Sequence, residues 1–237
     1  MKHRFFASTA LLVGMGMVPS LGQAVPISLN FENIAPYPNG NNVLINGFYN
    51  GGTSSIGTSG PNLGVGFSDN ALLICLNTIG TSCSNTSRGG LGDPNSQKGS
   101  LFFLSGIETF MNVAAGFDTG FSFNYTAVNQ GGSVTAFDGL GGTGNQLGTL
   151  NLGLTASTCT GLGSFCPFVT TFLAFAGTAK SIAFSGVANQ IVFDDVTFGK
   201  LTPGPSAVPL PAGLPLLATG IAALVAGRRL RKRNKSA

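Results

Sequence analysis

The sequence predicts an all-β fold, a jelly-roll-like β-sandwich over residues 25–200, between two apolar terminal segments. Apolar side chains recur at strand spacing, as in Phe121, Phe123 and Tyr125, and no segment between 25 and 200 keeps a period of 3.6 residues. The chain has 36 glycines for turns and 19 phenylalanines, with no tryptophan, for an aromatic core. We therefore expect roughly seven to ten short strands joined by glycine-rich turns.

The strands are expected in the following order. The first includes Phe31–Asn33, and a short buried run follows at Leu101–Leu104. Alternating apolar residues on both sides of a glycine-rich bend predict a hairpin over residues 134–152, with its turn at 138–142, where glycine supplies positive φ angles. Further strands are expected at residues 121–125, 171–176, 181–184 and 191–198.

The N-terminus has the pattern of a secretory signal peptide over residues 1–24. Lys2 to Arg4 are positively charged, Phe5 to Val18 form an apolar run, and Gly22–Ala24 is a small-x-small cleavage site for signal peptidase. The alternative is an uncleaved membrane helix. The apolar run is short for that, and Pro19 breaks it where a signal peptide would end. We therefore expect the body of the protein to be exported.

The charge of the chain is distributed unevenly. Of the 12 Lys and Arg residues, most lie in the first four positions or at and beyond residue 228. Residues 25–200 keep four basic residues against eight acidic ones, a formal charge of −4. This region has no basic stripe with which to neutralise phosphates, so the composition argues against nucleic-acid binding.

The C-terminal segment, residues 208–237, follows a short linker at 201–207. It opens with the proline-containing motif Val208, Pro209, Leu210, Pro211. The apolar run 212–227 rises about 24 Å as a helix, and flanking residues extend it toward the ~30 Å of a bilayer core. A dense basic end follows, which favours retention on the cytoplasmic side and places the body across the membrane; it comprises Arg228, Arg229, Arg231, Lys232 and Arg233.

This order of motif, transmembrane helix and basic end resembles the PEP-CTERM sorting signal of exported bacterial proteins. Leu210 stands where the family usually has Glu, which leaves the cleavage point less defined. The body resembles exported proteins of the same group in segments 48–53, 60–65, 111–113, 121–123 and 138–139, and in the terminal F-D-D-V-T-F-G. The resemblance implies recognition and cleavage by an exosortase after transient membrane anchoring. It also implies release or attachment at the cell surface or in an extracellular matrix, together with exopolysaccharide.

The four cysteines form two local pairs, Cys75 with Cys83 and Cys159 with Cys166, each flanking a polar, glycine-containing turn. An exported chain meets an oxidising compartment, so two disulfides that close small loops are expected, each worth about 2–3 kcal/mol. Cross-pairing is the alternative. Zinc ligation is disfavoured because C-x-x-C spacing is absent and no histidine lies near.

The sequence argues against an enzyme. The sole histidine is His3, in the predicted signal peptide, so no Ser-His-Asp or Cys-His site is available to the mature chain. A two-carboxylate glycosidase needs only a suitable pair of acids. No pair shows alternate spacing on one predicted strand, and most acids have turn-forming neighbours; the candidates are Glu32, Asp69, Asp93, Glu108, Asp118, Asp138, Asp194 and Asp195.

An early F-E and a terminal F-D-D-V resemble the jelly-roll carbohydrate-binding modules, in which such acids hold a structural calcium ion. The resemblance applies to Glu32, Asp194 and Asp195, whose carboxylates suit calcium. It also implies that the first and last strands are neighbours. Because successive residues of a strand point to opposite faces, only one of the two aspartates is expected to face the ion. In the alternative, one Asp faces solvent and the other caps the strand end.

Two functions follow as hypotheses. In the first, the protein is a structural or adhesive component of the cell surface or matrix. In the second, it is a lectin-like glycan-binding module with a structural calcium site. That module would have only Tyr37, Tyr49 and Tyr125 for stacking on a sugar ring. A permanently tail-anchored inner-membrane protein is a third possibility.

Overall fold

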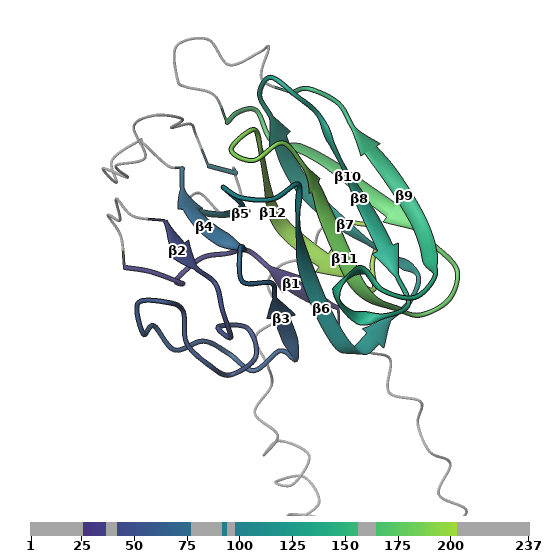
Figure 1. Cartoon of the computed structure of the whole chain (residues 1–237), viewed down its shortest axis with the longest axis horizontal. Helices are drawn as coiled ribbons and strands as arrows, with labels where there is room; N and C mark the ends of the chain where they lie inside the picture. Colours follow the sequence, from purple (N-terminus) through teal and green to yellow (C-terminus); the bar gives the residue numbers. More distant parts are fainter. Residues whose placement is uncertain (1–25, 37–41, 77–91, 94–97, 156–164, 203–237) are drawn as a thin grey trace, which may run out of the picture.

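A computed structural model of the chain describes residues 26–36, 42–76, 92–93, 98–155 and 165–202. These residues form an all-β structure with two antiparallel sheets, a seven-stranded and a five-stranded one (Figure 1). In this part of the chain a single 3₁₀ turn, Leu140–Gly142, is the helical element. The predicted β-sandwich is confirmed at this level, with more strands than the sequence pattern indicated.

The seven-stranded sheet runs in the order β10-β7-β12-β5-β4-β2, and β1 adds to β12. Its strands are β1 Ile27–Leu29, β2 Val43–Leu44, β4 Leu72–Cys75, β5 Gly99–Phe102, β7 Gly120–Ala127, β10 Val169–Ala174 and β12 Ile191–Phe198. The five-stranded sheet runs in the order β3-β6-β11-β8-β9. Its strands are β3 Val65–Phe67, β6 Glu108–Phe117, β8 Gly132–Phe137, β9 Gln146–Leu152 and β11 Ala179–Gly186.

The first and last strands are neighbours, as predicted. β1 pairs antiparallel with the second half of β12, and Ile27 lies opposite Phe198. The two ends of the domain therefore emerge at the same end of the sandwich (Figure 1). Strand direction places the loops 103–107 and 187–190 at the opposite end.

Phenylalanine rings fill the space between the sheets. Phe184 of one sheet lies 4.8 Å from Phe193 and 6.4 Å from Phe123 of the other, measured between ring centroids. Phe121 and Phe123 stack at 5.2 Å. All four are fully buried, so each contributes about 1.5–3 kcal/mol through the area it removes from water. The alternation of Phe121, Phe123 and Tyr125 thus identified the inner face of β7 correctly.

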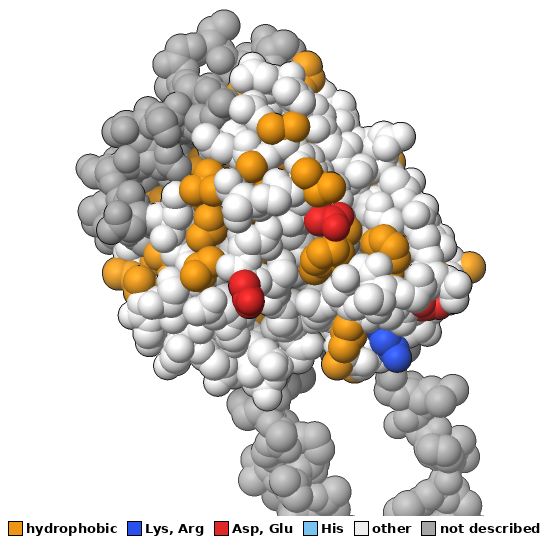
Figure 2. Space-filling model, viewed as in Figure 1, with side chains coloured by type: hydrophobic (Ala, Val, Ile, Leu, Met, Phe, Trp, Pro, Cys, Tyr) orange, Lys and Arg blue, Asp and Glu red, His pale blue; other side chains and the backbone are white. Residues whose placement is uncertain are grey.

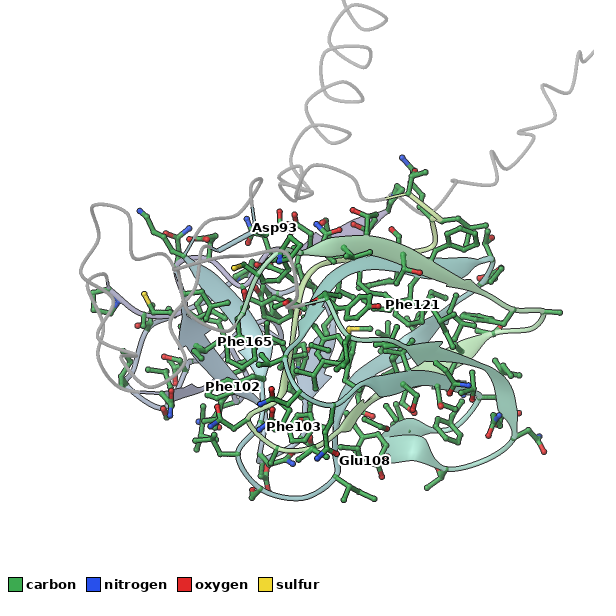
Figure 3. All side chains as sticks on the ribbon, turned by 90° about the horizontal axis from the view of Figure 1, so that it is seen from above. Asp93, Phe102, Phe103, Glu108, Phe121 and Phe165 are labelled. Atoms are coloured by element: carbon green, nitrogen blue, oxygen red, sulfur yellow. The ribbon has the colours of Figure 1, made fainter. Side chains whose placement is uncertain are left out.

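A second, smaller apolar cluster lies on the outer face of the seven-stranded sheet. It joins Ile74, Phe102 and Val192 of three neighbouring strands to Leu76 and Phe165. Phe102 and Phe165 appear next to each other in Figure 3. The sheet is therefore buried on both faces here, which is why β12 is buried along its entire length.

The hairpin over 134–152 is confirmed, as β8 pairs with β9 and the connection contains Gly141, Gly142 and Gly144 at positive φ. The strand expected at 191–198 matches β12. The expectation that Phe31–Asn33 lie in the first strand is wrong. β1 ends at Leu29, and Phe31 and Asn33 adopt φ angles of 52° and 61°, which direct the chain into a turn.

Several predictions fall outside the described residues. These are the signal peptide, the sorting motif with its apolar run and basic end, and Cys83 and Cys159. Neither Cys75 nor Cys166 is a free thiol, and the predicted pairing stays a prediction. Within the described ranges, no helix is long and apolar enough to cross a membrane.

Candidate functional site

The predicted aspartate pair lies at a β-bulge in the central strand β12. Asp194 is opposite Asn124 of β7, and the register then shifts before Thr197. Asp195 occupies the left-handed region at φ 47°, which a short polar side chain tolerates better than a branched one. The bulge interrupts the alternation of side chains along the strand. Consequently both carboxylates take part in one polar network, and the expectation that they face opposite sides is wrong.

Asn124 is the centre of this network. Its Nδ2 donates to Oδ2 of Asp93 at 2.6 Å and to Oδ2 of Asp195 at 3.3 Å. Its Oδ1 accepts from the Thr170 hydroxyl at 2.6 Å. One amide therefore connects β7, β10, β12 and the segment 92–93. Because Asn124 and the three acids Asp93, Asp194 and Asp195 are all buried, every one of these hydrogen bonds replaces contact with water.

Asp194 is fully buried, and its two oxygens have different partners. Oδ1 accepts the backbone N–H of Asp195 at 2.7 Å, and Oδ2 accepts the Ser100 hydroxyl at 2.9 Å. Burial raises the pKa of Asp194 well above its usual range, and repulsion from Asp195 and then Asp93 raises it further, against these two hydrogen bonds. The protonated acid is thereby favoured, because burying the charged form costs more.

Glu32 is attached to the beginning of β5. Its Oε1 accepts the backbone N–H groups of Lys98 at 2.7 Å and Gly99 at 3.1 Å. The chain passes so close here that a Cβ on Gly99 would collide with the carbonyl oxygen of Phe31. Glu32 thus holds the turn after β1 against β5. Gly99 therefore contacts Glu32, and the next residue, Ser100, contacts Asp194.

The calcium prediction concerned Glu32, Asp194 and Asp195. Within the described ranges, no three His, Cys, Asp or Glu side chains are grouped so that they could hold a metal ion. Two backbone N–H groups already occupy one oxygen of Glu32, and each oxygen of Asp194 accepts a hydrogen bond from the protein. These three acids do not make a complete ligand set by themselves, and calcium binding stays a prediction. Both aspartates are buried, so the alternative with one of them facing solvent does not describe the pair.

Sequence reasoning missed Asp93 and Asn124. Asp93 was assigned a turn role because it lies between Gly92 and Pro94. The available signal was the polar alternation of Ser122, Asn124 and Thr126 between the aromatic residues of β7. Such a pattern ordinarily marks a solvated face, and here that face is buried. The other acids are scattered, and Figure 3 shows Asp93 and Glu108 on opposite sides of the domain.

A cavity of about 930 Å³ lies at the end of the sandwich where both chain ends emerge. Ile27, Phe117 and Phe198 contribute apolar side chains to its lining, and Asp118 and Lys200 contribute opposite charges. Both charged residues are exposed, whereas Phe117 and Phe198 are almost fully buried. The cavity can therefore accept a partly polar molecule, but it offers little aromatic surface for stacking.

The tyrosines proposed to stack on a sugar ring are not available for that role. Tyr49 and Tyr125 are 4% and 7% exposed, and Tyr49 packs edge-on against Phe31 and Phe48. Tyr37 lies outside the described residues. Of the aromatic rings that the structure places, Phe172 on β10 is exposed, at 51%. This ring comes from a position that the sequence analysis did not single out.

Comparison with known proteins gives limited information. No family model and no curated protein matches the chain. Among solved structures, a family 6 carbohydrate-binding module is 20% identical over 54% of this chain and 92% of that one, with a TM-score of 0.31. The catalytic domain of a GH87 α-1,3-glucanase in complex with nigerose is 16% identical over 48% of this chain, with a TM-score of 0.29. The match spans about a quarter, 24%, of that glucanase chain. At these scores the likeness assigns no function.

Proposed function

We propose that this chain is an exported, non-enzymatic protein of the cell surface or extracellular matrix, in which the β-sandwich has a structural or adhesive role. The observation that carries the proposal is the pairing of Ile27 with Phe198, which brings both domain ends to one end of the sandwich. A predicted leader and a predicted sorting segment attach at that end. The loops at the opposite end are then free to face away from the membrane.

The C-terminal segment supports processing by an exosortase. The motif Val208–Pro211, the apolar run 212–227 and the basic end have the order of a PEP-CTERM signal. In this scheme signal peptidase removes residues 1–24, the apolar run anchors the chain transiently, and cleavage near the motif frees the sandwich. Exopolysaccharide is the surrounding material that this address implies.

A structural role is also supported by the chemistry of the acids. The mature chain has no histidine, and the clustered acids Asp93, Asp194 and Asp195 are buried and hydrogen-bonded. A two-carboxylate hydrolase needs its acid and its base beside the bound sugar. In this protein the same groups hold together four segments of the fold.

The proposal is tested on protein recovered from its host. N-terminal sequencing should begin at Val25 or within about two residues of it, and the intact mass should lack the residues beyond roughly 210. Neutral replacement of Arg228, Arg229, Arg231, Lys232 and Arg233 should cause missorting, because the electrostatic stop is removed. Neutral replacement of Lys180 and Lys200 on the sandwich is the control. A mature chain that retains its C-terminus would instead indicate a tail-anchored protein.

A lectin-like module is the second candidate, favoured by the cavity beside Asp118 and Lys200. A glycan array probed with and without calcium separates the two functions. A lectin should bind a defined glycan, and Asp118→Asn should weaken that binding, with Asp138→Asn as a control at a site outside the cavity. Calcium should raise the melting temperature only if an ion binds the folded state. A structural protein should give no selective glycan signal under either condition.

A further inference from the structure

The two lateral sides of the sandwich end in very different strands. On one side the edges are β2 and β3, with two and three residues. On the other side they are β9 and β10, with seven and six residues. Figure 1 shows β9 and β10 together at one side of the molecule and β2 at the other.

The backbone of β10 is paired along one side. Its six residues pair with β7 from Val169 opposite Tyr125 to Ala174 opposite Gly120. Among the described residues, no other backbone hydrogen bond involves 169–174, and β9 lies beside β10 without pairing to it. Alternate N–H and C=O groups of β10 therefore point away from the sheet. Such a row is a template for a further strand.

Proteins usually protect long edges with charges, prolines or shortness. β2 and β3 are protected by shortness. β9 and β10 are longer, and neither contains a proline. They also lack charge, because no Asp, Glu, Lys, Arg or His occurs between Asp138 and Lys180. The face shown in Figure 2 likewise has few charged side chains.

Apolar side chains accompany this unprotected edge. Val169 and Phe172 of β10 are 40% and 51% exposed, and Leu154, just after β9, is 59% exposed. Phe172 lies opposite Ser122 in the pairing with β7, so its ring stands on the outer face of the sheet next to the edge. A strand added at β10 would bury apolar area as well as backbone groups.

We propose that β10 is a self-association edge, at which two copies of this chain pair antiparallel to form a continuous sheet across both molecules. Antiparallel pairing of a strand with itself has two-fold symmetry, so the contact closes as a dimer. The occupant is a second copy because an uncharged strand meets itself without repulsion and has no charge with which to select a different partner. The edges β2 and β3 are too short to be the complement.

This inference deepens the proposed structural role, since a matrix component benefits from pairing with itself, but it does not depend on export. Its test uses the purified full-length chain in a mild detergent, which requires neither export nor cleavage. A failure of the export experiment would therefore leave the self-association test unaffected. A failure of the self-association test would likewise leave the export proposal unaffected.

The test compares three lysine substitutions by sedimentation equilibrium over a concentration series. Phe172→Lys and Val169→Lys each replace an exposed apolar side chain of β10 by a charge, which the added strand would have to remove from water. The control is Ile107→Lys, which makes the same change at a side chain that is 75% exposed on a loop at the far end of the sandwich. Thermal unfolding checks that each variant is folded.

At high concentration we expect the wild type and Ile107→Lys to have about twice the mass of the two edge variants, as a closed dimer requires. Hydrogen exchange in β10 should slow with increasing concentration in the wild type but not in Phe172→Lys. The inference is overturned if the wild type has the mass of one chain throughout. It is also overturned if both edge variants stay assembled, or if Ile107→Lys dissociates the protein equally.

Discussion

The two faces of β7 are equally buried and chemically opposite. The inner face presents Phe121, Phe123 and Tyr125 to the other sheet, whereas the outer face presents Ser122, Asn124 and Thr126. The inner face is stabilised by area removed from water and by ring contacts. The outer face depends on finding a hydrogen-bond partner for each polar atom. The two faces of β7 should therefore differ in how much a substitution lowers the free energy of unfolding, and the following substitutions measure that difference.

The largest effect is expected from the inner face. Phe123→Ala removes a fully buried ring that contacts Phe121, Tyr125, Phe184 and Phe193, so the free energy of unfolding should fall by about 3–5 kcal/mol. Urea denaturation followed by fluorescence or circular dichroism measures it. Ile56→Ala is the control, because its side chain is 52% exposed and its loss should change little. Equal effects of the two would contradict the assignment of the inner face as the core.

The next effect tests the centre of the outer network. Asn124→Ala removes one hydrogen bond from each of the buried acids Asp93 and Asp195 and from the exposed Thr170, so we expect a loss of about 2–3 kcal/mol in the free energy of unfolding. Asn129→Ala, which removes an exposed bond to Gln190, should cost far less. A neutral Asn124→Ala would show that water or another donor substitutes for the amide.

The third effect depends on pH. The folded-state pKa of Asp194 is raised, so its contribution to stability is fully present below the unfolded pKa of about 3.9 and is lost as pH rises toward the folded pKa. Between these two pKa values, Asp194 is protonated in the folded state and ionised in the unfolded state. The free energy of unfolding should therefore fall by about 1.4 kcal/mol per pH unit in that range. Asp194→Asn keeps an acceptor for Asp195 N–H and should remove this slope. The measurement is a chelator-containing pH series of urea melts.

Parallel slopes in the wild type and Asp194→Asn would show that another group titrates. Asp138→Asn serves as a control, because hydrogen bonds from Asn145 lower the pKa of this half-buried acid. Its substitution should leave the slope above pH 4 unchanged.

The smallest effect is expected from two hydroxyl groups on the outer face of β7, and it separates the effect of burial from that of hydrogen bonding. The hydroxyl of Ser122 is buried, and within the described ranges it has no hydrogen-bond partner. Ser122→Ala should therefore change the free energy of unfolding by less than about 0.5 kcal/mol or raise it. The comparison is Thr126→Val, which keeps the shape of the side chain and removes a hydroxyl that lies 2.7 Å from the hydroxyl of Thr155. It should cost about 1 kcal/mol. A larger loss for Ser122→Ala than for Thr126→Val would contradict the comparison.

The sequence predicted what depends on local pattern. β12 and the β8–β9 hairpin lie where alternation and glycine placed them, and the phenylalanines form the core. The features it missed depend on contacts between distant segments. Asn124 meets Asp93 and Asp195 only after β7, β12 and the segment 92–93 come together, and no local period encodes that meeting. The bulge at Asp195 changes a side chain's direction, and strict alternation cannot anticipate it. Burial of Tyr49 and Tyr125 likewise follows from the packing of whole sheets.

The position of β12 has a consequence for the kinetics of folding. This strand pairs with β7, β5 and β1, so the seven-stranded sheet lacks its centre until Ile191–Phe198 are available. Its contact with β1 joins segments from opposite ends of the domain, and such distant contacts form slowly because the closure of long loops is unfavourable. Nearly the whole chain must therefore emerge before the sheet can be completed, and a chain truncated before residue 191 would expose β5 and β7 as two unpaired edges.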